Sequence, residues 1–389
     1  MSWLEIRPRD VWLFRDGKPF AAGEDHSAYS MFPPTPLTLQ GALRQKIAES
    51  LGVSFAEYKA ASTPQAWKAI AYIGPWGKTL DTGKFCMAGP FVSLRLENDV
   101  VPLFPAPADL LHSEQGKWKI ASPSRSVKSD LGDNVLFPEV QPDYENMPDG
   151  WLAADVFTDY LNGKAPAQKV YYARETATMS SSSAAASYAE GKRVWHSQAL
   201  YLPESRFGVS IEAKTNYRKE GHLYQVQYVR PREGIGLLVS VESVPSDLLR
   251  GDMVLGGEQR HAVVETASVS AFPERSTPGK GRFKVVFLTP AYFAGGWQPT
   301  EGDWSYLFEQ QPVRLIGAAL YRPLRIGGWN GAANRPRTMH NYVAPGSVYY
   351  FEAEEALDRL PDALTENPEE IADAAAIGFG QYAVGKLED

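Results

Sequence analysis

Cysteine is almost absent from this sequence. The 389 residues include a single cysteine, Cys86, so no intramolecular disulfide can form. No CxxC pair is present, which excludes a structural zinc knuckle and fits a reducing cytoplasm. The first residues lack a basic segment followed by an apolar one, and no window approaches the roughly 20 apolar residues of a membrane span. We therefore expect a cytoplasmic protein without a signal peptide and without a membrane partner.

Motifs for catalysis or metal binding are also missing. The six histidines lie far apart, and none belongs to an HxxxH, HExxH or HD motif. GxSxG, Walker, kinase-type and GxGxxG motifs are absent. The sequence therefore predicts no catalytic residue, no metal ion and no cofactor, although residues distant in sequence can still assemble a site in space.

Apolar side chains are plentiful. Hydrophobic residues make up 44% of the chain and aromatic residues 12%, which excludes a disordered protein. The 33 glycines and 29 prolines imply many turns and few long helices. At about 100–200 residues per domain, the length suggests two or three domains.

Charge is unevenly distributed along the chain. The formal net charge of -7 argues against a protein that coats nucleic acid non-specifically, because such binding is mostly phosphate neutralisation. Residues 313–351 nevertheless contain five arginines and no acidic residue, whereas residues 352–389 contain eleven acidic and two basic residues. These charges are either solvated surface or a cationic groove beside an acidic face that repels stray nucleic acid.

A capped helix is predicted over residues 35–47. Thr35 suits the N-cap, and Pro36 suits the first helical position, where its missing N–H costs nothing. Apolar residues at positions 39, 43 and 47 share one face. We expect the helix start to leave free N–H groups beside the hydroxyls of Thr35 and Thr38, an arrangement that binds phosphate readily.

Gly41 lies inside this predicted helix, where glycine costs about 1 kcal/mol relative to alanine. Two explanations are open. The glycine either packs tightly on a neighbouring strand or allows a ligand backbone to approach.

Other segments carry weaker signals. Residues 3–6 and 11–14 read as strands, and residues 151–162 read as a short helix. A late helix is predicted over residues 368–377, with Asn367 as its N-cap.

Two long segments look irregular. Residues 102–150 contain seven prolines and are expected to form an excursion from the first domain. The serine- and alanine-rich residues 173–192 are either a plain linker or a loop that orders on an anionic partner, and they are flanked by Arg174 and Arg193.

Four glycine-rich segments share a pattern. Glycine has no Cβ and lets a polymer backbone come close, while tryptophan can stack on a base. Stacking of aromatic residues on sugars would explain the aromatics but not the arginine run. The segments are LGGEQR at 255–260, AGGW at 294–297, IGGWNG at 326–331 and GFGQYAVGK at 378–386.

Several runs resemble one protein family in the expected order from Arg15 to Gly385. The family is the third subunit of the Cmr complex, the type III-B CRISPR RNA-guided effector, within the RAMP superfamily of RNA-binding proteins. The runs are RDGKPF, PPTPLTLQGALRQ, YIGPWG, LGGEQR, LTPAYFAGGWQP, IGAALYRP followed by IGGWN, APGSVYYFE and GFGQYAVG.

The resemblance implies an α+β fold with two ferredoxin-like (RRM-type) halves and long loop insertions. Each half would be a βαββαβ unit with helices on one face of its sheet. We expect the N-terminal half over residues 1–205, with inserted loops at about 102–150 and 173–200. The C-terminal half would span residues 206–389 and end in a glycine-rich loop.

The resemblance also implies a non-catalytic CRISPR effector subunit. Such a subunit binds the 5′ repeat-derived tag of the guide RNA and caps the complex. Its implied partners are the guide RNA, the large polymerase/cyclase-type subunit and the first backbone RAMP subunit.

Site residues follow from the matching motifs. The helix start with Thr35, Thr38, Gly41 and Arg44 looks like the RNA-facing motif of the N-terminal half. The segment 378–385 looks like the C-terminal RAMP loop, but no basic residue lies between its glycines, so backbone N–H contact is expected there. The predicted RNA-binding residues are Arg15, Thr35, Thr38, Gly41, Arg44, Arg174, Arg193, Gly256, Gly257, Arg260, Trp297, Gly327, Gly328, Trp329, Arg337, His340, Gly378, Gly380 and Gln381.

Two other functions are open. A metal-independent endoribonuclease that processes guide RNA would need a general base, for which His26 and His340 are the candidates. A sugar-binding, β-rich protein is the third hypothesis.

Overall fold

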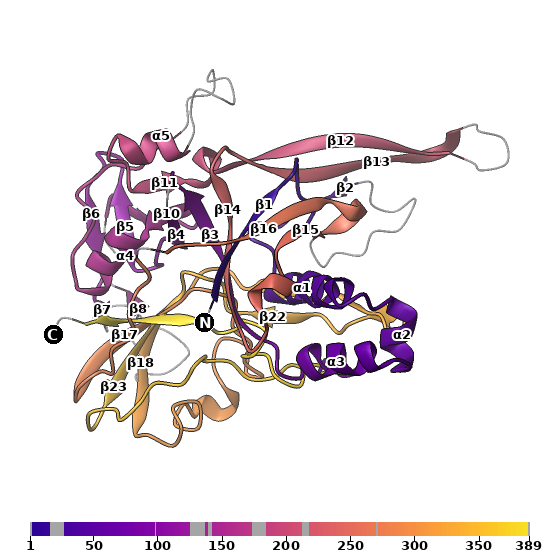
Figure 1. The fold of residues 1–389 in the computed structure, drawn as a ribbon. Helices are drawn as coiled ribbons and strands as arrows, with labels where there is room; N and C mark the ends of the chain where they lie inside the picture. The colour runs from indigo at the N-terminus through magenta and orange to yellow at the C-terminus, as the bar shows by residue number, and fades with distance from the viewer. Residues whose placement is uncertain are drawn as a thin grey trace.

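The architecture is mixed α/β, with mostly antiparallel strands and few helices (Figure 1). The computed structural model describes residues 2–15, 27–97, 99–124, 137–138, 142–172, 184–211, 218–269 and 271–387. Its α-helices are α1 (Pro36–Ser50), α2 (Phe55–Ala60), α3 (Pro64–Ile73), α4 (Ala154–Leu161) and α5 (Ala184–Ala189). The described residues also contain four 3₁₀ turns, η1 (Ser197–Ala199), η2 (Ser246–Leu248), η3 (Gly257–Gln259) and η4 (Thr300–Gly302).

An eight-stranded antiparallel sheet forms the larger layer. Its strand order is β11-β10-β4-β3-β14-β1-β16-β15. Along the chain these strands are β1 (Ser2–Pro8), β3 (Cys86–Arg95), β4 (Val100–Pro105), β10 (Gly150–Ala153), β11 (Val194–His196), β14 (Ile235–Glu242), β15 (Gly251–Val254) and β16 (His261–Thr266).

A four-stranded antiparallel sheet forms the second layer, in the order β18-β23-β17-β24. Its strands are β17 (Gly281–Phe287), β18 (Val313–Ala319), β23 (Val348–Ala353) and β24 (Tyr382–Lys386). A long hairpin of β12 (Tyr201–Ile211) and β13 (Arg218–Pro231) projects from the body, with β2 (Ser27–Ala28) beside it (Figure 1).

Short strands complete the described fold. The segment between β18 and β23 contains β19 (Leu324–Ile326) paired with β22 (His340–Tyr342), and β20 (Trp329–Asn330) paired with β21 (Arg335–Pro336). The 102–150 excursion leaves the large sheet at β4 and returns at β10. It contains β5 (Leu110–Ser113), β6 (Trp118–Ile120), β7 (Pro123–Ser124), β8 (Phe137–Pro138) and β9 (Tyr144–Asn146).

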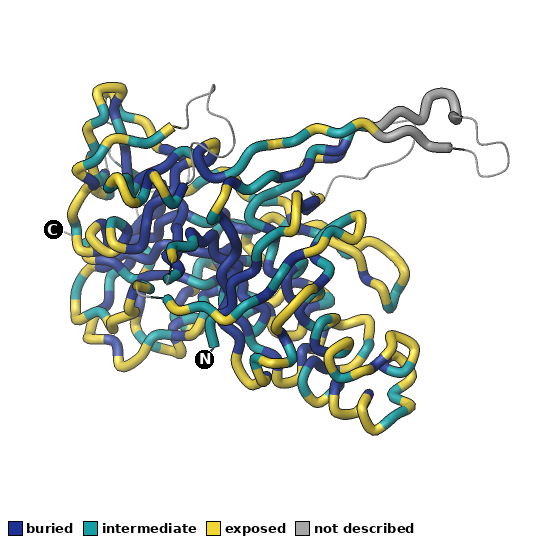
Figure 2. The backbone as a smooth tube through the Cα atoms, turned by 45° about the horizontal axis from the view of Figure 1, so that its top comes forward, coloured by how far each residue is buried: buried dark blue, intermediate teal, exposed yellow. Residues whose placement is uncertain are grey.

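The two sheets bury one face each against the other. Leu4 and Ile6 of β1 point to the side that α1 covers, where they share a core with Leu39, Leu43 and Ile47 of that helix. Phe91 and Leu238 point to the opposite side and share a core with alternate residues of β17, β18, β23 and β24. The buried strands run through the middle of the molecule in Figure 2, and the helical corner is largely exposed. The sheet faces away from the helix are therefore not open to a large ligand.

A buried charge pair also joins the layers. The Lys284 ammonium on β17 lies 3.4 Å from an Asp109 oxygen, and both side chains are almost fully buried. Tyr160 of α4 donates to the same carboxylate at 2.5 Å, and Tyr350 of β23 donates to it at 3.3 Å. These bonds satisfy charges that would otherwise be costly inside a core.

Several expected elements are confirmed. Helix α1 begins at Pro36 with Thr35 as N-cap, β1 covers residues 3–6, and α4 lies inside the predicted 151–162 helix. The expected strand at 11–14 contributes only a bridge between Trp12 and Val229. Part of the 173–192 segment is packed rather than a plain linker, because α5 buries Ser187, whose hydroxyl accepts from the Trp195 indole at 2.9 Å.

The predicted helix at 368–377 is wrong. Asn367 does not cap a helix; its side chain bonds the Ala372 carbonyl and the Ala374 N–H instead. Glu370 adopts a left-handed φ of 69°, which an α-helix does not tolerate. The segment consequently folds as consecutive turns.

The predicted division at residue 205 stays a prediction. The large sheet takes β1, β3, β4, β10 and β11 from before this residue and β14, β15 and β16 from after it. The four-stranded sheet comes entirely from residues beyond 280.

Candidate nucleic-acid interface

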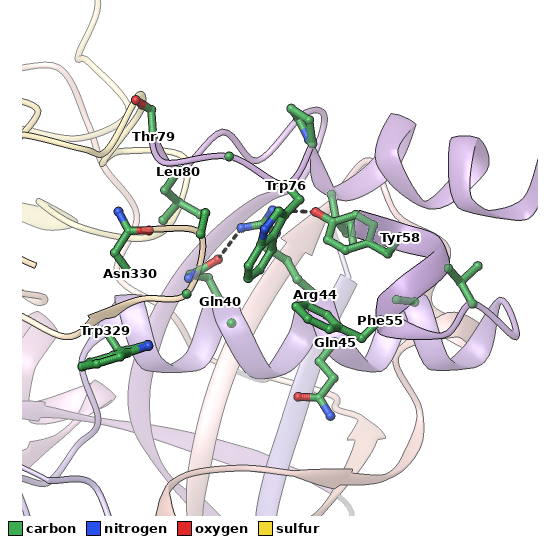
Figure 3. A pocket seen from close by; sticks show the side chains of 18 of the residues that line it. Gln40, Arg44, Gln45, Phe55, Tyr58, Trp76, Thr79, Leu80, Trp329 and Asn330 are labelled. Carbon is green, nitrogen blue, oxygen red and sulfur yellow. Dashed lines mark hydrogen bonds between the residues drawn. The ribbon is translucent and has the colours of Figure 1, made fainter. Parts of the chain in front are cut away.

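Four of the predicted site residues meet in a cleft beside helix α1, which we call the α1 cleft. Gly41 and Arg44 come from α1, while Trp329 and Arg337 come from the β20–β21 segment. The cleft has a volume of about 510 Å³ and is completed by the corner from α2 to residue 80 (Figure 3). Segments far apart in the sequence thus form one concave surface.

Gly41 presents bare backbone to this cleft. The residue is exposed, and a Cβ placed on it would have no neighbouring atom within 4 Å. The explanation by tight packing on a strand is therefore wrong. The remaining explanation for a glycine inside this helix is that it leaves room for a ligand backbone to approach.

Arg44 is held in place one helical turn further on. Its guanidinium donates to the Gln40 side chain at 3.3 Å, to the Tyr58 hydroxyl at 3.1 Å and to the Asp81 carbonyl at 3.2 Å. Its Nε–H is buried and has no acceptor among the described residues. The side chain is thus positioned at the cleft with one hydrogen-bond donor unused.

Aromatic rings line both sides of the cleft. Trp76 packs with its centroid 4.9 Å from that of Phe55 in an edge-on contact, and a Cβ at Gly331 would lie 2.8 Å from its ring. Trp329 lies to the left of these two rings in Figure 3 and is 60% exposed. Exposed rings beside an arginine are the arrangement on which single-stranded bases stack.

Arg337 was predicted to bind RNA, but its guanidinium is paired with a carboxylate of the protein. Its guanidinium bonds both the backbone and the side chain of Glu370 at 3.1 Å, and its side chain is only 11% exposed. Asn330 and Arg335 bond the same carboxylate. The bond from Asn330, followed by the charges of the two arginines, lowers the pKa of Glu370, and desolvation lowers the pKa of Arg337. This hub neutralises Arg337 and holds the β20–β21 segment against the rest of the protein.

The start of α1 offers fewer donors than expected. The Thr38 and Leu39 N–H groups donate to the Thr35 carbonyl at 3.0 and 3.2 Å, and Pro36 has no N–H. The Thr35 and Thr38 hydroxyls lie 3.2 Å apart and bond each other. In the described part of the chain, only the Leu37 N–H of the first turn lacks an acceptor.

The glycines of LGGEQR serve packing. A Cβ on Gly256 would lie 2.6 Å from the Leu13 carbonyl, and one on Gly257 would lie 3.0 Å from the Leu13 side chain. Arg260 lies over the Tyr228 ring at 4.6 Å and pairs with Glu258. This segment lies apart from the α1 cleft.

The C-terminal glycine loop is buried. A Cβ on Gly378 would lie 2.3 Å from the Gly89 carbonyl oxygen, and one on Gly380 would lie 2.5 Å from the Leu364 oxygen. The backbone N–H of Gln381 donates to the Thr289 hydroxyl at 2.9 Å. These backbone groups are engaged inside the isolated chain, and their contact with RNA stays a prediction.

The remaining predicted residues are dispersed. Trp297 packs on Tyr349, His340 packs edge-on against Tyr292, and Arg193 bonds Asp155 and the Tyr188 carbonyl. Gly328 contacts Leu37 of α1, with Gly327 beside it. Arg15 is exposed at a bridge to Ser30, and Arg174 lies outside the described residues, as does His26.

No cluster of three potential metal ligands occurs among the described residues. Within the same residues, no helix is both long enough and apolar enough to cross a membrane.

A protein-family model described as CRISPR-associated protein (Cas_Cmr3) matches residues 4–387. The chain belongs to the Cas_Cmr3 family. The family resemblance of its motifs is therefore confirmed, and the chain is a subunit of the type III-B CRISPR effector type. No curated protein matches the sequence.

Two solved structures are similar to this Cas_Cmr3 member. A chain of the type III-B Cmr-beta bound to cognate target RNA and AMPPnP has 14% identity and a TM-score of 0.46, covering 90% of this chain and 86% of that chain. A chain of the Csm3-Csm4 subcomplex in the type III-A CRISPR-Cas interference complex has 10% identity and a TM-score of 0.39, covering 95% and 100%.

Three of the Cas_Cmr3-like runs converge at the α1 cleft. PPTPLTLQGALRQ supplies α1, YIGPWG supplies Trp76, and IGGWN supplies Trp329 and Asn330. Residue-by-residue prediction missed Trp76, Phe55, Tyr58 and Asn330. The YIGPWG run is the sequence signal for Trp76, and the IGGWN run is the signal for Asn330.

Proposed function

We propose that this chain binds the 5′ repeat-derived tag of the guide RNA through the α1 cleft, without catalysing a reaction. The observation that carries the proposal is the convergence of bare helix backbone at Gly41, a fixed arginine and exposed tryptophan in one cleft. Close backbone approach, a cation and stacking surfaces are the elements by which proteins hold splayed single-stranded RNA.

We also propose that the chain contains two ferredoxin-like units. The strand order β3-β14-β1-β16 in the large sheet and β18-β23-β17-β24 in the small sheet support this, since both read 2-3-1-4 along the chain with antiparallel neighbours. The first unit would then include residues on both sides of position 205, with a long insertion between β3 and β14. The face of the large sheet that points away from α1 packs against the four-stranded sheet. That face is not open to RNA, so RNA would bind at helix ends and loops.

The proposal includes partners and location. We infer from family membership that the chain caps the Cmr complex, docks its large subunit and its backbone RAMP subunit, and works in the cytoplasm. Reconstitution with each subunit tests this, and the absence of a stable complex with both would refute it.

Tryptophan substitution tests the RNA site. Trp329→Ala should weaken the binding of a labelled single-stranded RNA with the tag sequence by about tenfold or more, because a stacked base contributes about 1–3 kcal/mol. Folding stability should change by less than about 0.5 kcal/mol, since the side chain is exposed. Trp67→Ala is the matched control, because Trp67 is equally exposed at 61% but does not line the cleft.

Arginine substitution tests the charge contribution. Arg44→Gln should lower the affinity and reduce the salt slope by about 0.7 if a phosphate contact is lost. Equal RNA binding by Trp329→Ala, Arg44→Gln and the native chain would refute the cleft as the site. Cleavage of repeat RNA in EDTA that is lost in His340→Ala would instead make the protein an endoribonuclease.

A further inference from the structure

A second cavity lies beside the residues that precede α1. Its volume is about 440 Å³, and its wall includes seven prolines, so we call it the proline pocket. The prolines come from both sheets and from the segment before α1: Pro33, Pro34, Pro90, Pro105, Pro148, Pro290 and Pro345. Phe32, Trp151 and Tyr321 add aromatic rings.

Two chain segments connect this pocket to the α1 cleft. Thr35 lines the pocket and Gln40 and Gly41 line the cleft, so these lining residues lie about 7.5–9 Å apart along the helix axis at a rise of about 1.5 Å per residue. The second segment lines the pocket with residues 320–324 and the cleft with residues 329–331. Between the sites, a Cβ on Gly328 would lie 3.1 Å from the Leu37 side chain, so the two segments lie close to each other there.

The wall of the pocket suits a flat ring. Proline has no N–H, the Thr289 hydroxyl donates to the Gly378 carbonyl, and the Tyr321 hydroxyl donates to the Ala106 carbonyl. The Asn146 amide, the Trp151 indole and the Arg322 guanidinium are the side-chain donors of the lining that make no hydrogen bond within the described residues. A planar ring with an anionic group beside it matches this lining.

The charges of the 313–351 segment point to the same place. Arg314 pairs with Glu352, and both Arg335 and Arg337 pair with Glu370. The side chains of Arg322 and Arg325 are exposed and make no ion pair or hydrogen bond within the part of the chain described. The uncompensated charge of Arg322 therefore lies at the proline pocket, which this residue lines.

We propose that the proline pocket is a second nucleotide subsite for the same single-stranded RNA, a proposal that rests on the function proposed above. One base enters the proline pocket, another stacks in the α1 cleft, and Arg322 contacts a phosphate of this strand. The separation exceeds the rise of about 3.4 Å between stacked nucleotides, so the two bases are splayed apart.

An abasic scan of the RNA tests the two subsites. The full-length protein is titrated with labelled single-stranded tag RNAs in which one abasic nucleotide is moved along the sequence. The native protein should lose about fivefold or more in affinity at two positions that are not stacked neighbours. Leu320→Glu, at an exposed pocket residue, should abolish the sensitivity at one position, and Trp329→Ala should abolish it at the other.

A charge variant tests the phosphate contact. Arg322→Gln should weaken binding several-fold and reduce the salt slope by about 0.7. Arg250→Gln makes the same change at an exposed arginine outside both cavities and should leave the affinity unchanged.

The outcomes separate the two proposals. If the native protein fails to bind the RNA, both are wrong. If binding depends on Trp329 but only one abasic position matters and Leu320→Glu and Arg322→Gln bind normally, the second subsite alone is overturned. If Leu320→Glu preserves RNA affinity but abolishes association with a co-expressed Cmr subunit, the pocket docks protein and the subsite is also overturned.

Discussion

The α1 cleft and the C-terminal loop carry the same sequence signature and use it in opposite ways. Both are glycine-containing runs that suggested close approach of RNA. At the cleft, Gly41 is exposed and a Cβ there would have open space around it. In the loop, Gly378 and Gly380 are buried, and a Cβ on either would collide with protein backbone.

The difference lies in what approaches the glycine. In the loop the approaching backbone belongs to the protein, at Gly89 and Leu364, so the glycine maintains the fold. At the cleft, no atom lies within 4 Å of a Cβ placed on Gly41. This glycine therefore lowers the stability of the helix without a packing contact that compensates. Substitution at the two sites should therefore separate effects on folding from effects on binding.

Gly378→Ala should give the largest effect on stability. The residue has a φ of 95°, and the new methyl would meet the Gly89 carbonyl, so we expect a loss of about 3–5 kcal/mol in the free energy of unfolding. Urea denaturation measures it. Gly279→Ala is the control, because nothing lies within 4 Å of a Cβ there and its stability should change little. If Gly378→Ala instead keeps its stability but loses RNA binding, the expectation is wrong and the loop is part of the RNA interface.

Gly41→Ala should have the opposite combination of effects. The free energy of unfolding should rise by about 1 kcal/mol, because alanine is the better helix former and meets no obstacle. RNA affinity should fall several-fold, because the methyl occupies the space that the ligand backbone uses. Thermal melting and RNA titration of the same sample measure both. A stabilised variant with unchanged affinity would show that bare backbone at this position is not part of the interface.

Local signals in the sequence predicted part of the fold. Helix α1 and its Thr35 cap follow from short-range rules that operate within a few residues. The late helix failed because Asn367, an apparent cap, bonds the turn at 372–374 instead, and because Glu370 is required in a left-handed conformation by contacts with Asn330 and Arg337. Those contacts come from a distant segment that short-range rules do not include.

Residue types that are typical of RNA contact predicted part of the lining of the α1 cleft. Gly41, Arg44 and Trp329 were found because glycine, arginine and tryptophan suggest RNA contact, and they do line the cleft. Arg337 carries the same signal but is neutralised by Glu370, which lies 33 positions away in the acidic stretch. Counting charge along the sequence separated the arginine run from its acidic partners, and only the fold pairs them.

Glu370 connects the α1 cleft with the segment before the C-terminal loop. Its titration should give the smallest effect on stability. Its carboxylate lies at the start of the segment that leads to the buried loop, and it bonds Asn330 and both arginines of the cleft segment. These bonds lower its pKa from the ordinary 4.5, so their stabilisation is present above that pH and is lost as the pH falls through the lower folded value. Glu370→Gln should be less stable than the native protein at pH 7, and the gap should close in urea denaturation as the pH drops below about 4.5. Glu369→Gln, at the neighbouring exposed carboxylate, should show a smaller gap. A gap for Glu370→Gln that stays constant with pH would mean that hydrogen bonding alone, without charge, fastens the cleft to the buried loop.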